Sequence, residues 1–179
     1  MPEPVARVHE LSTPSLTRQA AALTVCLAIP YAAAAIGGYA TSRSLGDWYG
    51  AIEKPDWTPS GQTIGAVWTV LYGLMGLSAW LSWRAAALRD GADGRAVQAR
   101  GWFLCQLGLN VAWSFAFFGL RSPLAGLVVI VPLWLSVAAW IRAAGRLSLV
   151  AGWLQAPYLG WVGFAAFLNG TIWWLNREP

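Results

Sequence analysis

Long stretches without a charged residue constrain the fold of this 179-residue chain more than any other feature of its sequence. Five such stretches occur, each at least 20 residues long, at 19–42, 57–83, 101–120, 122–141 and 147–176. An α-helix of about 20 apolar residues crosses the roughly 30 Å hydrocarbon core of a bilayer. We therefore predict an all-α membrane protein, a five-transmembrane-helix bundle with helices at about 19–42, 63–83, 101–120, 123–141 and 147–175.

The composition agrees with a membrane-embedded domain. Hydrophobic residues make up 57% of the chain and charged residues 11%, whereas soluble domains carry about 25% charged residues. We assign residues 1–18, which mix Pro, Ser, Thr and charges, to a disordered N-terminal tail, and residues 19–179 to one transmembrane domain. The short polar links at 121–123 and 142–147 predict that the helices they join run antiparallel.

The basic residues predict the orientation of the bundle. With five spans, eight Lys and Arg residues fall on the side of the N-terminus, and four fall on the other side: Arg43, Lys54, Arg121 and Arg177. The positive-inside rule then places the N-terminus in the cytoplasm and the 43–60 loop outside. The net charge of +4 comes from residues in the short polar segments between the predicted spans and in the N-terminal tail. We therefore expect no nucleic-acid partner.

The sequence offers little for conventional catalysis or metal binding. Cys26 and Cys105 lie inside apolar stretches without a CxxC motif, and the one histidine, His9, lies in the N-terminal tail. We therefore expect free, buried thiols, no metal site and no required cofactor. The predicted helices contain no charged residue, which argues against an ion-coupled pump built on intramembrane carboxylates.

A proline-containing loop precedes the second predicted helix, and we interpret it as a lid. It carries Trp48, Lys54, Pro55, Trp57 and Pro59. Proline fixes φ and disfavours helical backbone in the residue before it, so the loop should be stiff. Because tryptophan rings are costly to leave in water, both should fold back onto apolar surface.

Three predicted helices each place large aromatic rings and a few polar atoms on one face. These faces are Trp68, Tyr72 and Met75; Asn110, Trp113 and Phe117; and Tyr158, Trp161, Ala165 and Leu168. Asn110 and Asn169 need partners, because an unsatisfied amide in hydrocarbon costs several kcal/mol. The pattern fits helix packing with asparagine bridging the helices. It fits equally an aromatic pocket beneath the lid for a flat, apolar ligand.

Small residues on the third predicted helix suggest a close helix contact. Gly108, Ala112 and Ala116 lie opposite the face of Asn110 and Trp113. Such a face lets another helix approach closely, either in a homodimer or within one chain. The first predicted helix offers a rival small face with Ala33 and Gly37, and Ala34 and Gly38.

Four sequence motifs together resemble one known family. They are WYxxxxKPxWxP at 48–59, VWxxLYxxMG at 67–76, LNxxWSxxFF at 109–118 and PYLxWxxFxxxLNxxIW at 157–173. In this order they are similar to the TspO/translocator protein family, also called tryptophan-rich sensory proteins and peripheral-type benzodiazepine receptors. The resemblance implies five transmembrane helices, often a dimer, and a ligand pocket beneath the first loop. It assigns ligand contacts to Trp57, Trp68, Asn110, Trp113, Trp161, Ala165 and Leu168.

The resemblance also implies what the ligands are. Family members bind tetrapyrroles such as protoporphyrin IX and haem, and some bind sterols or benzodiazepine-type compounds. We therefore expect a porphyrin transporter, sensor or scavenger in a bacterial cell membrane, inner or outer, rather than in the mitochondrial outer membrane. The family also links the positions of Trp68 and Trp161 to oxidative breakdown of porphyrin. Light- and oxygen-dependent porphyrin degradation and a purely structural membrane protein are the alternatives.

Overall fold

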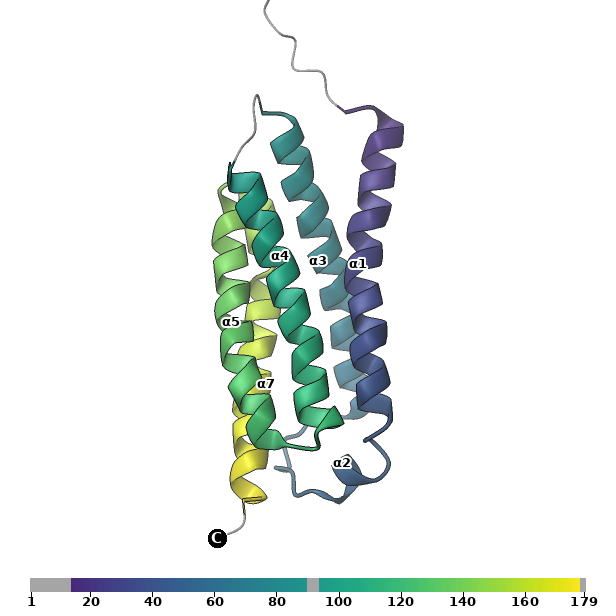
Figure 1. Ribbon diagram of the computed structural model, residues 1–179, viewed down its shortest axis with the longest axis vertical. Helices are drawn as coiled ribbons and strands as arrows, with labels where there is room; N and C mark the ends of the chain where they lie inside the picture. Colours follow the sequence, from purple (N-terminus) through teal and green to yellow (C-terminus); the bar gives the residue numbers. More distant parts are fainter. Residues whose placement is uncertain (1–13, 90–93, 178–179) are drawn as a thin grey trace, which may run out of the picture.

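The computed structural model describes residues 14–89 and 94–177, and within these ranges all regular structure is helical (Figure 1). The elements are α1 (Leu16–Ser42), α2 (Trp48–Ala51), α3 (Gly61–Ala87), α4 (Gly94–Ser114), η1 (Phe115–Gly119), α5 (Pro123–Gly145), α6 (Leu149–Trp153) and α7 (Ala156–Leu175). The π-helix η1 continues α4 directly. The long helices α1, α3, α4, α5 and α7 lie side by side, and α2 covers one end of the bundle (Figure 1).

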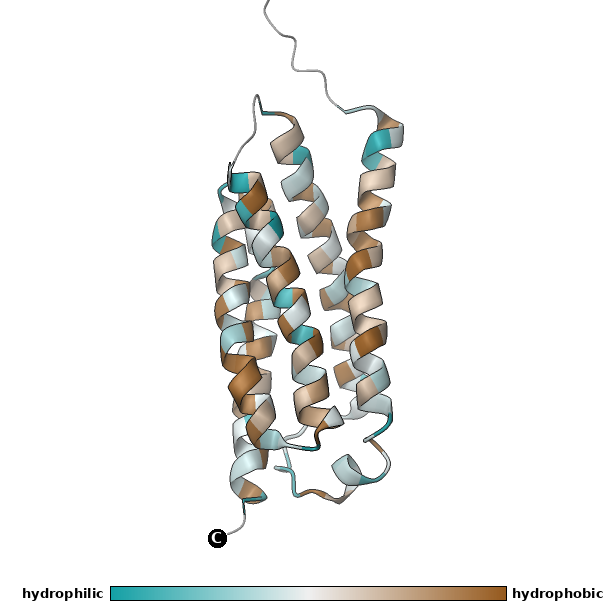
Figure 2. Ribbon diagram, in the orientation of Figure 1, coloured by the Kyte–Doolittle hydropathy of each residue, from teal (hydrophilic) through white to brown (hydrophobic). Residues whose placement is uncertain are grey.

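Four of the helical segments in the described ranges are long and apolar enough to cross a membrane: Leu16–Ser42, Gly61–Ala87, Gly94–Gly119 and Pro123–Gly145. Hydrophobic residues dominate along the helices, and hydrophilic ones gather toward their ends (Figure 2). Helix α7 has 20 residues, but its Trp, Tyr, Pro and Asn residues score low in hydropathy. The fifth predicted span is therefore not identified by length and hydropathy.

The prediction of one continuous helix over 147–175 is wrong. The chain forms α6, turns at Leu154 and Gln155, and then begins α7. Pro157 explains the break, because it has no N–H to donate and its ring would clash with the carbonyl of Trp153 in a continuous helix. The Ser148 hydroxyl caps the start of α6 by accepting a hydrogen bond from the N–H of Ala151 at 3.3 Å.

Other helices extend beyond their charge-free stretches. Helix α3 continues through Arg84 to Ala87, and α4 already includes Arg95 and Arg100. A charged residue ends an apolar stretch without interrupting the backbone hydrogen bonds of a helix. Helix α1 begins at Leu16, inside the predicted tail, and is capped by Ser15. The predicted disorder of residues 1–13 lies outside the described residues.

Close backbone packing joins α1 to α3 and α4, and α5 to α4 and α7. At the α1–α3 contact, a Cβ on Gly76 would lie 2.7 Å from Leu27 Cδ2 and 2.8 Å from the carbonyl oxygen of Cys26. Real Cβ atoms do not come that close, so the missing side chain of Gly76 permits this contact.

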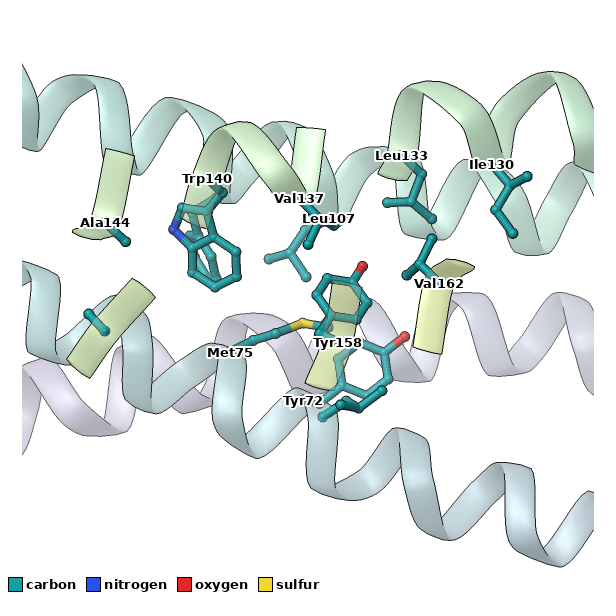
Figure 3. Close-up of a cluster of buried hydrophobic side chains, with 13 residues drawn as sticks. Tyr72, Met75, Leu107, Ile130, Leu133, Val137, Trp140, Ala144, Tyr158 and Val162 are labelled. Atoms are coloured by element: carbon teal, nitrogen blue, oxygen red, sulfur yellow. The ribbon is translucent and has the colours of Figure 1, made fainter. Parts of the chain in front are cut away.

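The core that joins α3 to α6 and α7 lies away from the lid. The Ser78 hydroxyl donates to the carbonyl of Ala151 at 2.7 Å, and the Gln155 amide donates to the carbonyl of Leu74 at 2.8 Å. Buried side chains from α3, α4, α5 and α7 fill the space between these helices (Figure 3). Helices α3 and α7 make few close backbone contacts with each other, and a cavity lies between them under the loop.

Candidate functional site

A cavity of about 830 Å³ lies under the 44–60 loop, between α1, α3, α4 and α7. Small-molecule sites are typically clefts of about 300–1,000 Å³. The predicted residues that line the cavity come from two parts of the chain, the aromatic faces of the helices and the proline-containing part of the loop. They are Trp68, Tyr72, Asn110, Trp113, Phe117, Trp161, Ala165 and Leu168 from the helices, and Lys54, Pro55 and Pro59 from the loop.

The two loop tryptophans do not line the cavity but attach the loop to the bundle. Trp57, which is 45% exposed, stacks on Phe167 with ring centroids 5.4 Å apart and meets Phe164 edge-on at 5.9 Å. Trp48 meets Phe117 edge-on at 5.5 Å. Both rings fold back onto apolar surface, as predicted. Trp57 is not among the residues that line the cavity, and the ligand contact that the family resemblance assigns to it stays a prediction.

Tyr158, a predicted ligand-binding residue, does not line the cavity; it is fully buried at 0% exposure and bonds to Asn110, which does line it. Its hydroxyl donates to Gln106 Oε1 at 3.0 Å and accepts from Asn110 Nδ2 at 3.2 Å. The hydroxyl of Tyr72 donates to Asn110 Oδ1 at 2.8 Å, which completes a chain of four side chains. Figure 3 shows Tyr72 and Tyr158 close together beside Met75. Asn110 therefore has the partners that an intramembrane amide requires.

A second asparagine fixes one wall of the cavity. Asn169 accepts a hydrogen bond from Trp113 Nε1 at 3.2 Å and donates to the carbonyl of Pro123 at 2.8 Å. The ring of Trp113 stacks on Phe117 with centroids 5.4 Å apart and an interplanar angle of 22°. Since the indole is held both at its N–H and across its face, it presents a fixed flat surface to the cavity.

The indole N–H of Trp161 is buried and has no hydrogen-bond partner among the described residues. Buried donors are normally satisfied, and an unpaired one costs about 1–3 kcal/mol. Trp161 lines the cavity together with Trp68 and Trp113. The ring of Trp161 thus contributes apolar surface to the cavity wall, while its N–H is buried and unpaired.

The loop is held closed by polar contacts as well as by its tryptophans. Lys54 Nζ donates to the carbonyls of Tyr49 at 2.6 Å and Ile52 at 2.7 Å, and lies 5.0 Å from the centroid of the Tyr49 ring. Burial raises the pKa of the Tyr49 phenol, which keeps it protonated. At the end of α7, Asn176 forms two hydrogen bonds with the backbone of Glu53, each 2.9 Å long.

The sequence reasoning missed the contribution of α1 to the cavity. Tyr31, Ala34, Gly37 and Gly38 line it, and the Tyr31 hydroxyl donates to the carbonyl of Thr69 at 3.1 Å. The small residues of this helix, which the sequence analysis interprets as a packing face, are the signal for this part of the wall. Short side chains at these positions leave room beside the aromatic walls. Further lining residues that the sequence analysis does not single out include Tyr49, Ser114, Phe118 and Phe164, and Asn169, predicted only to need a partner, also lines the cavity.

The proposed dimer face is divided between exposed and buried positions. Gly108 and Ala112 are exposed on α4, whereas Ala116 is buried.

The expectation of buried thiols is wrong for Cys105, which is exposed, while Cys26 is half-buried; both are free. An apolar residue can face lipid, so an apolar stretch alone does not predict burial inside a membrane bundle.

The fold and the site define an all-helical membrane protein with an aromatic-walled cavity under a structured loop. The chain matches the TspO/MBR family over residues 26–175 and belongs to this family. It is 38% identical to the "Tryptophan-rich protein TspO" of Archaeoglobus fulgidus over 165 residues, which cover 90% of this chain and 99% of the relative. It is also 36% identical to the "Translocator protein" of Sus scrofa over 146 residues, covering 79% and 85% of the two chains.

Proposed function

We propose that this TspO-family membrane protein binds a tetrapyrrole such as protoporphyrin IX or haem in the cavity beneath the loop, and acts in porphyrin transport, sensing or scavenging. The observation that carries the proposal is the convergence of Trp68, Trp113 and Trp161 from three helices on one cavity. Flat indole surfaces favour a flat aromatic guest, because stacked or edge-on aromatic contacts add to the burial of apolar area.

One polar group on the cavity wall, the ammonium of Lys54, suits a carboxylate-bearing ligand, whereas the carboxylate of Asp56, which also lines the cavity, does not. Lys54 lines the cavity, and its ammonium donates to two backbone carbonyls, so one of its three N–H donors remains for an anion. Within the described part of the chain, the cavity wall contains no His, Cys or Met. A tetrapyrrole would therefore be held by stacking and by its carboxylates, without the usual nitrogen or sulfur ligands of iron.

Titration with protoporphyrin IX, followed by quenching of tryptophan fluorescence, tests this proposal. We expect saturable quenching for the unmodified protein and a loss of affinity of at least roughly tenfold for Ala165→Phe, which fills the cavity. Val70→Phe adds the same ring at a position that is 62% exposed on α3 and outside the cavity wall, and it should bind normally. Without saturable quenching, the aromatic residues would be left with a packing role only.

Porphyrin breakdown under light and oxygen is a second candidate function, supported by the shared position of Trp68 and Trp161 on the cavity wall. An indole is readily oxidised and can react with a photogenerated species beside it. Illumination of the complex should then degrade porphyrin more slowly in Trp68→Phe and Trp161→Phe. Trp134→Phe, which lies outside the cavity wall, serves as the control. Equal porphyrin decay in all three variants would remove this candidate while leaving the binding proposal intact.

The same proposal includes the membrane arrangement. We infer five spans, with α7 as the fifth, the N-terminus in the cytoplasm and the loop outside. The bacterial cell membrane is the favoured location, since Chlorobaculum tepidum has a relative 37% identical over 165 residues.

A sterol or a lipid is a further candidate ligand. A homodimer through the exposed part of the small-residue face at Gly108 is also proposed, and cross-linking of Gly108→Cys in native membranes would test it.

A further inference from the structure

A second hollow lies on the outer flank of the bundle and shares no residue with the central cavity. It is an open groove of about 840 Å³ between the last turn of α1 and the α4–η1 segment. The residues that line it are Tyr39, Ala40, Arg43, Ser44, Ala112, Phe115, Ala116, Gly119, Leu120 and Arg121. The porphyrin site proposed above uses none of them. Ala112 and Ala116 belong to the predicted dimer face, so a lipid in this groove and a dimer through these two residues are alternatives.

Two arginines give this groove a positive rim. Arg43 follows α1 directly, and Arg121 lies between η1 and α5, so both stand where spanning helices end on the lid side. Arg43 Nη1 donates to the Tyr39 hydroxyl at 2.8 Å, and its guanidinium lies 5.3 Å from the centroid of that ring. Arginine carries five N–H donors, so most of those on Arg43 remain for a ligand. Asp and Glu are absent from the described lining.

The backbone at Arg121 points to a role for this side chain. Its φ is 52°, which makes it the one non-glycine residue with positive φ among the described residues. For a bulky residue this left-handed conformation costs about 1–2 kcal/mol, and glycine would adopt it freely. A strained residue that places a cation beside a groove is a reason to look for an anionic partner there.

The floor of the groove is apolar. Ala112 and Phe115 are exposed beside buried Ala116, and Leu120 is 72% exposed. Gly119 has no side chain, and a Cβ there would meet only Phe115, at 3.5 Å or more, so this position leaves space. The groove thus combines cations at the membrane–water boundary with an apolar channel along a spanning helix. That is the polarity of one lipid molecule, from headgroup to acyl chain.

We propose that this groove binds an anionic phospholipid, with the phosphate between Arg43 and Arg121 and one acyl chain along Ala112 and Ala116. A second copy of the chain fits less well. A two-fold contact through this groove would bring Arg43 and Arg121 of both copies together, and like charges across an interface are unfavourable.

Native mass spectrometry of the full chain, extracted from nanodiscs containing phosphatidylglycerol and phosphatidylcholine with the same acyl chains, tests the proposal. We expect the unmodified protein to retain phosphatidylglycerol with roughly tenfold preference, since each basic residue near a membrane surface contributes to anionic-lipid binding. Arg43→Gln combined with Arg121→Asn should abolish this preference, and Asn tolerates the backbone at position 121. Arg177→Gln, an exposed arginine that lies over Trp174 on the same side of the bundle, should keep it.

Gly119→Leu tests the acyl channel separately, because it fills the groove and leaves both arginines in place. Phosphatidylglycerol retention should fall in this variant as well, and thermal unfolding in phosphatidylcholine nanodiscs verifies that each variant is folded. Unchanged retention in the arginine double variant or in Gly119→Leu would overturn the proposal. The proposal would also be overturned if glycerol phosphate, which has no acyl chain, displaced the bound lipid as well as free phosphatidylglycerol does. A dimer cross-linked through Ala112→Cys and free of lipid would overturn it too.

Discussion

The side chain of Asn176 pairs with the backbone of Glu53 through two hydrogen bonds, one donated by the N–H of Glu53 and one accepted by its carbonyl, each 2.9 Å long. The same amide also donates to the carbonyl of Ile172 at 2.8 Å. Asn176 therefore connects the end of α7 to the middle of the loop that roofs the cavity. Because the loop also rests on Trp57 and Trp48, it is attached to the bundle at several independent points.

Removing this pairing should loosen the loop without unfolding the bundle. We expect Asn176→Ala to increase amide hydrogen exchange in residues 48–59 and to speed protoporphyrin release about two- to tenfold. This corresponds to the roughly 0.5–1.5 kcal/mol that a hydrogen bond contributes. Thr171→Ala on the same helix removes only a hydrogen bond to the carbonyl of Phe167 and serves as the control. Identical exchange in both variants would show that Asn176 does not hold the loop.

The hydroxyl of Tyr158 should contribute more to stability than that of Tyr72. Tyr158→Phe would leave both Asn110 Nδ2 and Gln106 Oε1 unpaired in the buried core, whereas Tyr72→Phe would leave only Asn110 Oδ1 unpaired, beside the cavity. At about 1–3 kcal/mol for each of the two orphaned buried groups, Tyr158→Phe should cost roughly 2–6 kcal/mol of unfolding free energy. Equilibrium unfolding in mixed micelles measures both variants. A larger loss for Tyr72→Phe would contradict the network as described.

The contact between α1 and α3 predicts a large effect for one added methyl group. Gly76→Ala should destabilise the bundle by about 1–3 kcal/mol, because the new Cβ would meet the backbone of Cys26 and Leu27, which cannot move aside independently. Gly65→Ala on the same helix meets nothing within 4 Å and should be neutral or slightly stabilising. Thermal unfolding of the two variants checks this, and equal midpoints would refute the close contact.

The conformation of Arg121 predicts a gain in stability on substitution. Arg121→Gly should raise the unfolding free energy by about 1 kcal/mol in detergent without anionic lipid, because glycine adopts positive φ without the steric cost. Arg121→Val should have the opposite effect, since a β-branched side chain is least tolerated there. Unfolding midpoints in the same micelles report both changes. A loss of stability in Arg121→Gly would mean that the side chain itself supports the turn.

Helical periodicity identified much of the cavity wall from the sequence. The spacing of Trp68, Asn110 and Trp161 with their neighbours predicted aromatic faces, and all three residues line one cavity. Intramembrane asparagine also carried a reliable signal, since an amide in hydrocarbon requires a partner. Asn110 has two such partners in Tyr72 and Tyr158.

Other features depend on how helices meet, which spacing along one helix does not report. Small residues in α1, such as Gly37 and Gly38, indicated close packing, yet they also make room for the cavity. Trp57 attaches the loop through Phe167 instead of facing inward. The absence of charge over 147–176 does not report the break before Pro157, because that break comes from the backbone restriction that proline imposes.

A structure of the full chain saturated with protoporphyrin IX tests the central claim most directly. The account predicts a porphyrin ring inside the cavity, against Trp68, Trp113 and Trp161, beneath Pro55 and Pro59. A ring bound only on the lipid-facing surface, with the cavity unchanged, would contradict the account.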